Sequence, residues 1–77
     1  MDPKDAIEFL NDFINRNPDD DRAYYMRGLK HWNLNHHKEA INDYLAALRL
    51  NPQSEAKYAL EYANSIMDFY HKDLLNP

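Results

Sequence analysis

Residues 18–52 read PDDDRAYYMRGLKHWNLNHHKEAINDYLAALRLNP, and this stretch decides the fold. The prolines at its two ends each follow an asparagine, and their separation equals a known repeat period of about 34 residues. Inside the stretch, aromatic and small residues fall where a helix-turn-helix repeat of that period needs them. These residues are Tyr24, Gly28, Ala40, Tyr44 and Ala47. The chain is therefore expected to be a helical repeat protein.

Two helices are predicted inside this stretch, over about Asp20–Leu34 and about His37–Leu50. Aspartates at the first start can accept backbone N–H groups as N-caps, and Asn35 tolerates the left-handed backbone that often ends a helix. Gly28 lies in mid-helix, where glycine costs about 1 kcal/mol relative to alanine. We expect Gly28 to face Ala40, because two small residues let antiparallel helices pack closely.

The segment before this stretch is predicted to form a further helix over about Lys4–Arg16. Its apolar residues follow the i, i+3, i+4, i+7 spacing of a helix with one buried face. A shift by one repeat period places Ala6 on Ala40 and Leu10 on Tyr44, which belong to the second helix of the repeat. The chain therefore opens with the second helix of a repeat whose first helix is missing.

The segment over residues 53–75 is predicted to form one long helix of roughly twenty residues, which frays after Lys72. Ser54 can cap its start. The same shift by one period places Tyr62 on Gly28, and a tyrosine is too large for close packing of a following helix. Terminal units of repeat proteins depart from the repeat pattern because they cap the stack, so this helix is expected to be a cap.

These features resemble the tetratricopeptide repeat family, in particular the short, stand-alone members that are common in bacteria. Six of eight signature positions match in the full repeat, whereas Arg27 replaces the usual leucine and His31 the usual tyrosine. The resemblance implies an all-α fold, an antiparallel helix-turn-helix array of about four helices with right-handed superhelical packing. We expect residues 1–77 to form a single domain. Its parts are a half repeat over about 3–17, a full repeat over about 19–52 and a C-terminal capping helix over about 54–73.

The resemblance also implies a protein–protein interaction module, because the family binds peptides or helices in a concave groove. By position, the groove would be lined by Arg22, Tyr25, Met26, Leu29, Trp32 and Asn33, with Ala56, Ala59, Leu60 and Ala63 from the final helix. Some members hold a C-terminal carboxylate with lysine and asparagine side chains. Tyr25, Met26 and Leu29 occupy those positions here, so an apolar groove without a carboxylate clamp is expected. The sequence does not identify the partner.

Tyr25 and Trp32 have two interpretations. Tyr24 and Gly28 already occupy the face of the helix that meets the core, which leaves these two side chains on an adjoining face. They either line the groove or pack against the long C-terminal helix of the same chain. The second interpretation lets that helix occupy the groove in place of a partner.

The charge balance argues against nucleic acid and membranes as partners. Nine Lys and Arg residues against thirteen Asp and Glu residues give a net charge of -4, without a basic cluster. No apolar run approaches the roughly 18 residues that span a bilayer. The N-terminus shows no signal-peptide pattern, so a cytoplasmic location is expected, and a periplasmic one stays open if a signal was removed.

The sequence contains no pattern typical of an enzyme or a metal site. The absence of cysteine excludes disulfides and thiolate metal ligands. His36 and His37 are adjacent at a turn and His31 lies on the preceding helix, so they lack the spacing of a helical metal pair. No glycine-rich phosphate loop and no serine elbow are present. We therefore expect a non-enzymatic protein with no cofactor and no metal.

Structural self-assembly is the alternative function. The opening helix lacks the first helix of its repeat, and it offers more apolar surface than one neighbouring helix can cover. The side chains concerned are Phe9, Leu10, Phe13 and Ile14. We expect a two-fold symmetric homodimer with the opening helices at or near the interface. The opposing hypothesis is that the tail around Phe69, Tyr70 and Leu74 folds back over this face within one chain.

Overall fold

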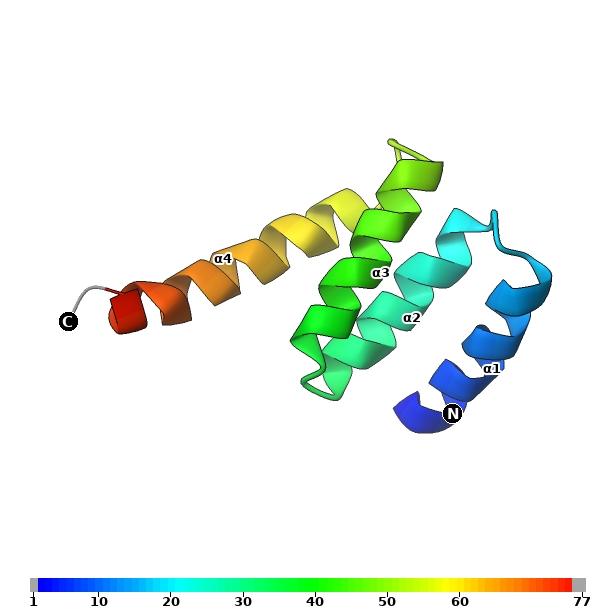
Figure 1. The fold of residues 1–77 in the computed structure, drawn as a ribbon, viewed down its shortest axis with the longest axis horizontal. Coiled ribbons are helices and arrows are strands. Elements are labelled where there is room, and N and C mark those ends of the chain that lie inside the picture. The colour runs from blue at the N-terminus through cyan, green and yellow to red at the C-terminus, as the bar shows by residue number, and fades with distance from the viewer. Residues whose placement is uncertain (1, 76–77) are drawn as a thin grey trace.

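The computed structural model describes residues 2–75, with side chains described for residues 2–66, and it contains four α-helices. The helices are α1 (Pro3–Arg16), α2 (Asp21–Asn33), α3 (His37–Leu50) and α4 (Ala56–Leu75). No strand occurs among the described residues, and the predicted all-α fold is confirmed. The first three helices lie side by side, whereas α4 crosses α3 and extends away from α1 (Figure 1).

Polar caps and prolines set the ends of the first two helices. Asp2 and Asp20 accept hydrogen bonds from backbone amides two and three residues later, at 3.3 and 3.2 Å. Pro3 occupies the first turn of α1, where its missing N–H is not needed. α1 ends at Arg16 because Pro18 disfavours the helical conformation for the residue before it.

The turn between α2 and α3 is closed by a left-handed residue and an aromatic stack. Asn35 has a φ of 61°, a conformation that asparagine tolerates better than most non-glycine residues. The His36 amide then donates to the His31 carbonyl at 2.8 Å, which ties the turn back onto the end of α2. The ring of Trp32 stacks on His37 with the centroids 4.2 Å apart. The predicted role of Asn35 at the end of this helix is confirmed.

α2 and α3 approach each other closely at Gly28. A Cβ atom on this residue would lie 2.6 Å from Cε1 of Tyr44 and 3.2 Å from the carbonyl oxygen of Ala40. Only glycine leaves room for that approach without displacing the tyrosine ring. The predicted close packing at Gly28 is confirmed, and it involves Tyr44 as well as Ala40.

α4 is one continuous helix of 20 residues, as predicted. The Ser54 hydroxyl accepts a hydrogen bond from the Ala56 amide at 3.1 Å and so caps its start. The helix continues to Leu75, beyond the expected fraying point at Lys72. The sequence contains no glycine and no proline between Pro52 and Leu75 that would end it earlier.

The core has two parts. The first lies at the contact of α3 and α4, and its buried residues are Ala40, Tyr44, Ala47, Ala56 and Ala63. The second lies between α1 and α2, and its buried residues are Leu10, Ile14 and Ala23. Most buried residues of the first part are alanines, whose small side chains let α4 pack closely on α3. The side of α4 that faces away from α3 is available for other contacts.

Candidate functional site

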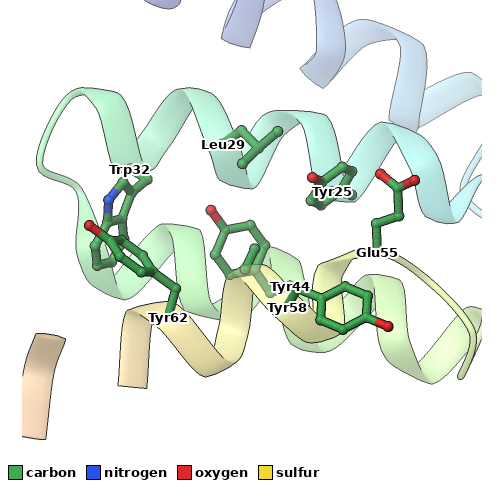
Figure 2. A pocket seen from close by; sticks show the side chains of 8 residues that line it. Tyr25, Leu29, Trp32, Tyr44, Glu55, Tyr58 and Tyr62 are labelled. Carbon is green, nitrogen blue, oxygen red and sulfur yellow. The ribbon is translucent and has the colours of Figure 1, made fainter. Parts of the chain in front are cut away.

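An open cleft of about 470 Å³ lies between α2 and α4 (Figure 2). Most of its lining side chains are aromatic. The lining residues are Tyr25, Leu29 and Trp32 of α2, Tyr44 of α3, Glu55, and Tyr58, Ala59 and Tyr62 of α4. Helical spacing explains how the two walls form, because residues three or four positions apart share one face of a helix.

Two pairs of aromatic rings contact each other in the cleft. The ring centroids of Tyr25 and Tyr44 are 6.3 Å apart, and those of Trp32 and Tyr62 are 6.0 Å apart with the rings edge to face. These distances lie in the range of about 4.5–7 Å over which aromatic rings attract. Tyr58 and Tyr62 nevertheless remain 69% and 60% exposed. The α4 wall of the cleft is therefore open to a ligand.

Few of the side chains that line the cleft are ionisable at physiological pH. Burial raises the pKa of Tyr44 to about 12, with smaller contributions from Tyr25 and Asp43, so its hydroxyl is neutral at physiological pH. Glu55 is the single charged residue among the described residues that line the cleft. A carboxylate ligand would find no cationic side chain among the described residues that line the cleft.

Both interpretations of Tyr25 and Trp32 describe part of the observed geometry. The two side chains are half-buried, and they line the cleft. Trp32 also contacts Tyr62 of α4. α4 thus forms the opposite wall of the cleft and does not fill it.

Arg22 and Met26, which were expected in the same groove, lie outside this lining. They line a smaller hollow of about 300 Å³ that shares Tyr25 and Glu55 with the cleft. They also line a separate groove between α1 and α2. The cleft therefore contains only part of the residue set expected from position in the repeat.

The expected contributions from α4 are also divided. Ala59 lines the cleft, whereas Leu60 is half-buried against the core between α3 and α4. Ala56 and Ala63 are fully buried, so they belong to the core and not to a groove. Their side of α4 packs on α3, which is why their predicted placement is wrong. Asn33 is exposed near the end of α2 and is not part of the cleft lining.

Four residues of the cleft lining are not among those predicted from the sequence. Tyr44 was predicted only as an aromatic signature residue of the repeat, and Tyr62 only as a residue too large for close packing. Tyr58 lies one repeat period after the core-facing Tyr24, and no role was predicted for Glu55. The i, i+4 spacing of Tyr58 and Tyr62 on an expected terminal helix is the signal that could have identified this wall.

The groove between α1 and α2 has a volume of about 590 Å³. It is lined by Ala6, Phe9, Leu10, Phe13, Asp20, Arg22, Ala23, Met26 and Lys30. Among the four residues expected to self-associate, Leu10 and Ile14 are buried and Phe13 is half-buried. Phe9 is 58% exposed, and Met26 beside it is 48% exposed. The apolar surface of α1 is thus concentrated at Phe9 and is narrower than expected.

The C-terminal tail does not cover this groove. α4 extends away from α1 on the far side of α3 (Figure 1). The hypothesis that the tail folds back onto the opening helix is therefore wrong. The side chains of Phe69, Tyr70 and Leu74, which that hypothesis invoked, lie outside the described side chains.

The histidines form one close pair. The Nδ1 atoms of His31 and His36 are 3.3 Å apart, and burial lowers the pKa of His31. Within the described part of the chain, no three His, Cys, Asp or Glu residues are grouped so as to hold a metal ion. Nor does any helix of that part have the length and apolar character required to cross a membrane.

Comparison with known proteins gives one match. Residues 21–54 match the family model of the tetratricopeptide repeat. The match begins at the first residue of α2, includes all of α3 and ends before α4. No curated protein and no solved structure matches the chain. Such repeats form a non-catalytic module that generally mediates protein–protein interaction. Residues 21–54 therefore form one full repeat of the tetratricopeptide type.

Proposed function

We propose that the chain is a protein–protein interaction module that binds a helix or peptide of a partner in the cleft between α2 and α4. The observation that supports this proposal is the exposed tyrosine wall of α4, which faces Tyr25 and Trp32 across an open cleft (Figure 2). Tyrosine and tryptophan are the most frequent anchors of protein interfaces. The module has no catalytic role in this proposal, and its expected location is the cytoplasm.

The lining predicts the chemistry of the bound segment. An apolar or aromatic side chain of the partner fits between the two walls, where it can pack on the faces of Tyr58 and Tyr62. Glu55 at the cleft favours a basic residue next to that anchor. A segment that ends in an acidic C-terminus is disfavoured, because the described lining carries one carboxylate and no cation.

The proposal is tested by selecting peptides from a random display library on the wild-type protein. Selected peptides should contain an aromatic or large aliphatic residue near a Lys or Arg residue. Their affinity is then measured by fluorescence polarisation for the wild type and for a Tyr58→Ser/Tyr62→Ser variant. Both tyrosines are mostly exposed, so this variant is expected to fold and to lose at least about tenfold in affinity.

A matched control distinguishes the cleft from the other apolar surface. Phe9→Ser removes an exposed aromatic side chain from α1, and it should leave peptide affinity unchanged. A peptide ending in Glu-Glu-Val-Asp should not bind the wild type. The proposal fails if the selected peptides bind the tyrosine variant as tightly as the wild type, or if Phe9→Ser weakens them equally.

Self-association through the groove between α1 and α2 is a second candidate function. It is supported by the exposure of Phe9 and Met26, which form adjoining apolar surface beside a groove of about 590 Å³. Large apolar side chains clustered on a surface often mark an interaction site. Light scattering on a size-exclusion column should give twice the monomer mass, and Phe9→Ser should shift the mass toward the monomer.

A further inference from the structure

Two stripes of side chains lie on α1 and α2 beside the groove between them. The α1 stripe consists of Asp5, Phe9, Asp12 and Arg16, whose i, i+4, i+7, i+11 spacing places them along one side of the helix. In the α1 stripe, Phe9 lines the groove itself, and the other members share its side of the helix. The α2 stripe consists of the N-cap residue Asp20 and of Arg22, Met26 and Lys30 within the helix, all of which line the groove. The charged members of the α1 stripe are exposed, as is Arg22.

The charges of the two stripes are opposite at each of the three charged levels along the groove. α1 and α2 are joined by a short turn, so the end of α1 lies beside the start of α2. Asn11 and Arg27 confirm this alignment in mid-helix, where Asn11 Oδ1 accepts a hydrogen bond from Arg27 Nη1 at 2.9 Å. From the turn outward, the levels are Arg16 and Asp20, Asp12 and Arg22, Phe9 and Met26, and Asp5 and Lys30.

These charges are not paired across the groove within one chain. Among the described residues, no salt bridge joins the two stripes. Arg16 instead contacts Asp12 of its own helix at 2.6 Å, and both side chains are largely exposed, at 66% and 69%. An exposed pair of this kind is weak, so both residues can exchange partners at little expense.

We propose that this face binds the same face of a second copy of the chain, with a two-fold axis that runs along the helices between α1 and α2. α1 of each copy then lies on α2 of the other. This inference rests on the self-association candidate and specifies its geometry. Phe9 meets Met26 of the second copy at the centre, and Asp5 meets Lys30 of the second copy at the end distant from the turn.

The order of charges favours a second copy over an unrelated helix. A uniformly acidic or uniformly basic partner would meet like charges at several levels, whereas the rotated face presents the opposite sign at every charged level. A two-fold interface also forms each contact twice, so each complementary pair contributes two times. The exposed apolar residues Phe9 and Met26 lie at the centre, as interface anchors generally do.

Helix electrostatics gives a competing explanation for part of this pattern. Asp5 lies in the first turn of α1 and Arg16 in its last turn, positions that complement the helix dipole in a monomer. That explanation predicts no change in molecular mass when the charges are reversed. The proposed interface predicts a large change, and the two explanations are therefore separable.

The test uses two single charge reversals, Asp5→Lys and Lys30→Glu, measured by sedimentation velocity over micromolar to submillimolar concentrations. The wild type should dimerise. Each single variant places like charges together twice in its homodimer, so its dimer dissociation constant should rise by about ten- to a hundredfold. The double variant Asp5→Lys/Lys30→Glu restores opposite charges and should dimerise as the wild type does.

Mixing the two single variants gives the sharpest outcome. In a mixed dimer, Lys at position 5 of one copy faces Glu at position 30 of the other, and the remaining pair is the native Asp5 with Lys30. An equimolar mixture should therefore form heterodimers with about the affinity of the wild type, although each variant alone dimerises more weakly. Recovery on mixing also shows that neither single variant is merely misfolded.

Charge changes on α3 are the matched controls. Glu39→Lys and Lys38→Glu make the same reversals at exposed positions of that helix and should leave the dimer unchanged. A wild type that stays monomeric at the highest concentration overturns self-association and this geometry together. A wild-type dimer that the reversals do not weaken, or single variants that fail to combine on mixing, overturns the geometry alone.

Discussion

Arg27 of α2 and Asp43 of α3 form a bidentate ion pair in which Nε and Nη2 donate to the two carboxylate oxygens at 2.9 and 2.8 Å. Only 8% of the Asp43 side chain and 21% of the Arg27 side chain are exposed. The hydrogen bond to Asp43 raises the pKa of Arg27 despite the opposing effect of burial. Arg27 replaces the leucine that is usual in the family, so an ion pair here replaces an apolar contact between the two helices.

Removing the arginine alone should destabilise the fold more than removing both partners. Arg27→Leu leaves the Asp43 carboxylate buried without its partner, and the free energy of unfolding should fall by about 2–4 kcal/mol. Arg27→Leu/Asp43→Leu removes the unpaired charge and should recover most of that loss. Urea denaturation of the wild type, both single variants and the double variant measures the cycle. A double variant as unstable as the sum of the single variants would contradict this account.

Gly28 should resist substitution by alanine. Alanine favours a helix by about 1 kcal/mol over glycine, but its Cβ would lie 2.6 Å from Cε1 of Tyr44. Displacing the ring is expected to outweigh the gain, for a net loss of about 1–2 kcal/mol in the free energy of unfolding. Thermal denaturation should show a smaller loss, or a gain, when Gly28→Ala is introduced into a Tyr44→Leu background. An equal loss in both backgrounds would show that Tyr44 is not the obstacle.

The His31–His36 pair should make the fold sensitive to mild acid. Burial lowers the pKa of His31 below its usual value of 6.5, so the unfolded chain binds a proton at higher pH than the folded chain does. The neutral His31 therefore contributes its full stabilisation at pH values above the pKa that His31 has in the unfolded chain. This contribution is lost as the pH falls through that value toward the lower pKa of His31 in the folded chain.

Urea unfolding midpoints between about pH 7.5 and pH 5.5 measure this effect. His31→Tyr introduces the residue usual in the family and should flatten the dependence on pH, whatever its effect on stability at neutral pH. The two proteins share every other residue, so the difference between the two curves isolates the contribution of His31. Curves of equal slope would rule out a contribution from this histidine.

Most of the fold could be predicted from the sequence because its determinants are local. Asp20 as a cap, Asn35 as a left-handed residue and Pro18 as a stop signal each act within a few residues of their own position. The close approach at Gly28 follows from the repeat period, which brings it opposite Ala40 and Tyr44. The C-terminal end of α4 was less predictable, because no glycine or proline between Pro52 and Leu75 marks it.

The cleft was only partly predictable because its shape depends on tertiary arrangement. Tyr25, Leu29 and Trp32 could be assigned to one face of α2 from helical spacing alone. The repeat period aligned Tyr58 with Tyr24, yet Tyr24 is half-buried and donates to the Pro18 carbonyl at 3.0 Å, whereas Tyr58 is 69% exposed. Repeat position could not show this difference, since burial depends on which neighbouring segment covers each ring.

The placement of Arg22 and Met26 also could not be predicted from their position in the repeat. Position in the repeat assigned them to the binding groove, but in this chain they line the groove that α2 forms with α1. Because no repeat helix packs in front of α1 in the described structure, that side of α2 forms a second surface with α1. Assigning groove residues by their position in the repeat assumes that a repeat helix packs on each side of α2. The prediction therefore combined two separate surfaces of α2 into one groove.

The buried hydroxyl of Tyr44 should make the fold sensitive to alkaline pH. Tyr44 is only 2% exposed, and burial raises its pKa from the usual 10.0 to about 12. A folded pKa above the unfolded pKa means that the unfolded chain loses its proton first as the pH rises. The contribution of the neutral Tyr44 to stability is therefore complete below about pH 10 and is lost progressively toward pH 12.

Tyr44→Phe removes the ionising hydroxyl while keeping the ring that packs against Gly28. Urea unfolding followed by circular dichroism should show a smaller loss of stability for this variant than for the wild type between about pH 10 and pH 12. Tyr58→Phe is the matched control, because it removes a hydroxyl from a mostly exposed side chain and should follow the wild type. If Tyr44→Phe and the wild type lose stability in parallel, the alkaline sensitivity arises elsewhere, and burial of this hydroxyl is not its cause.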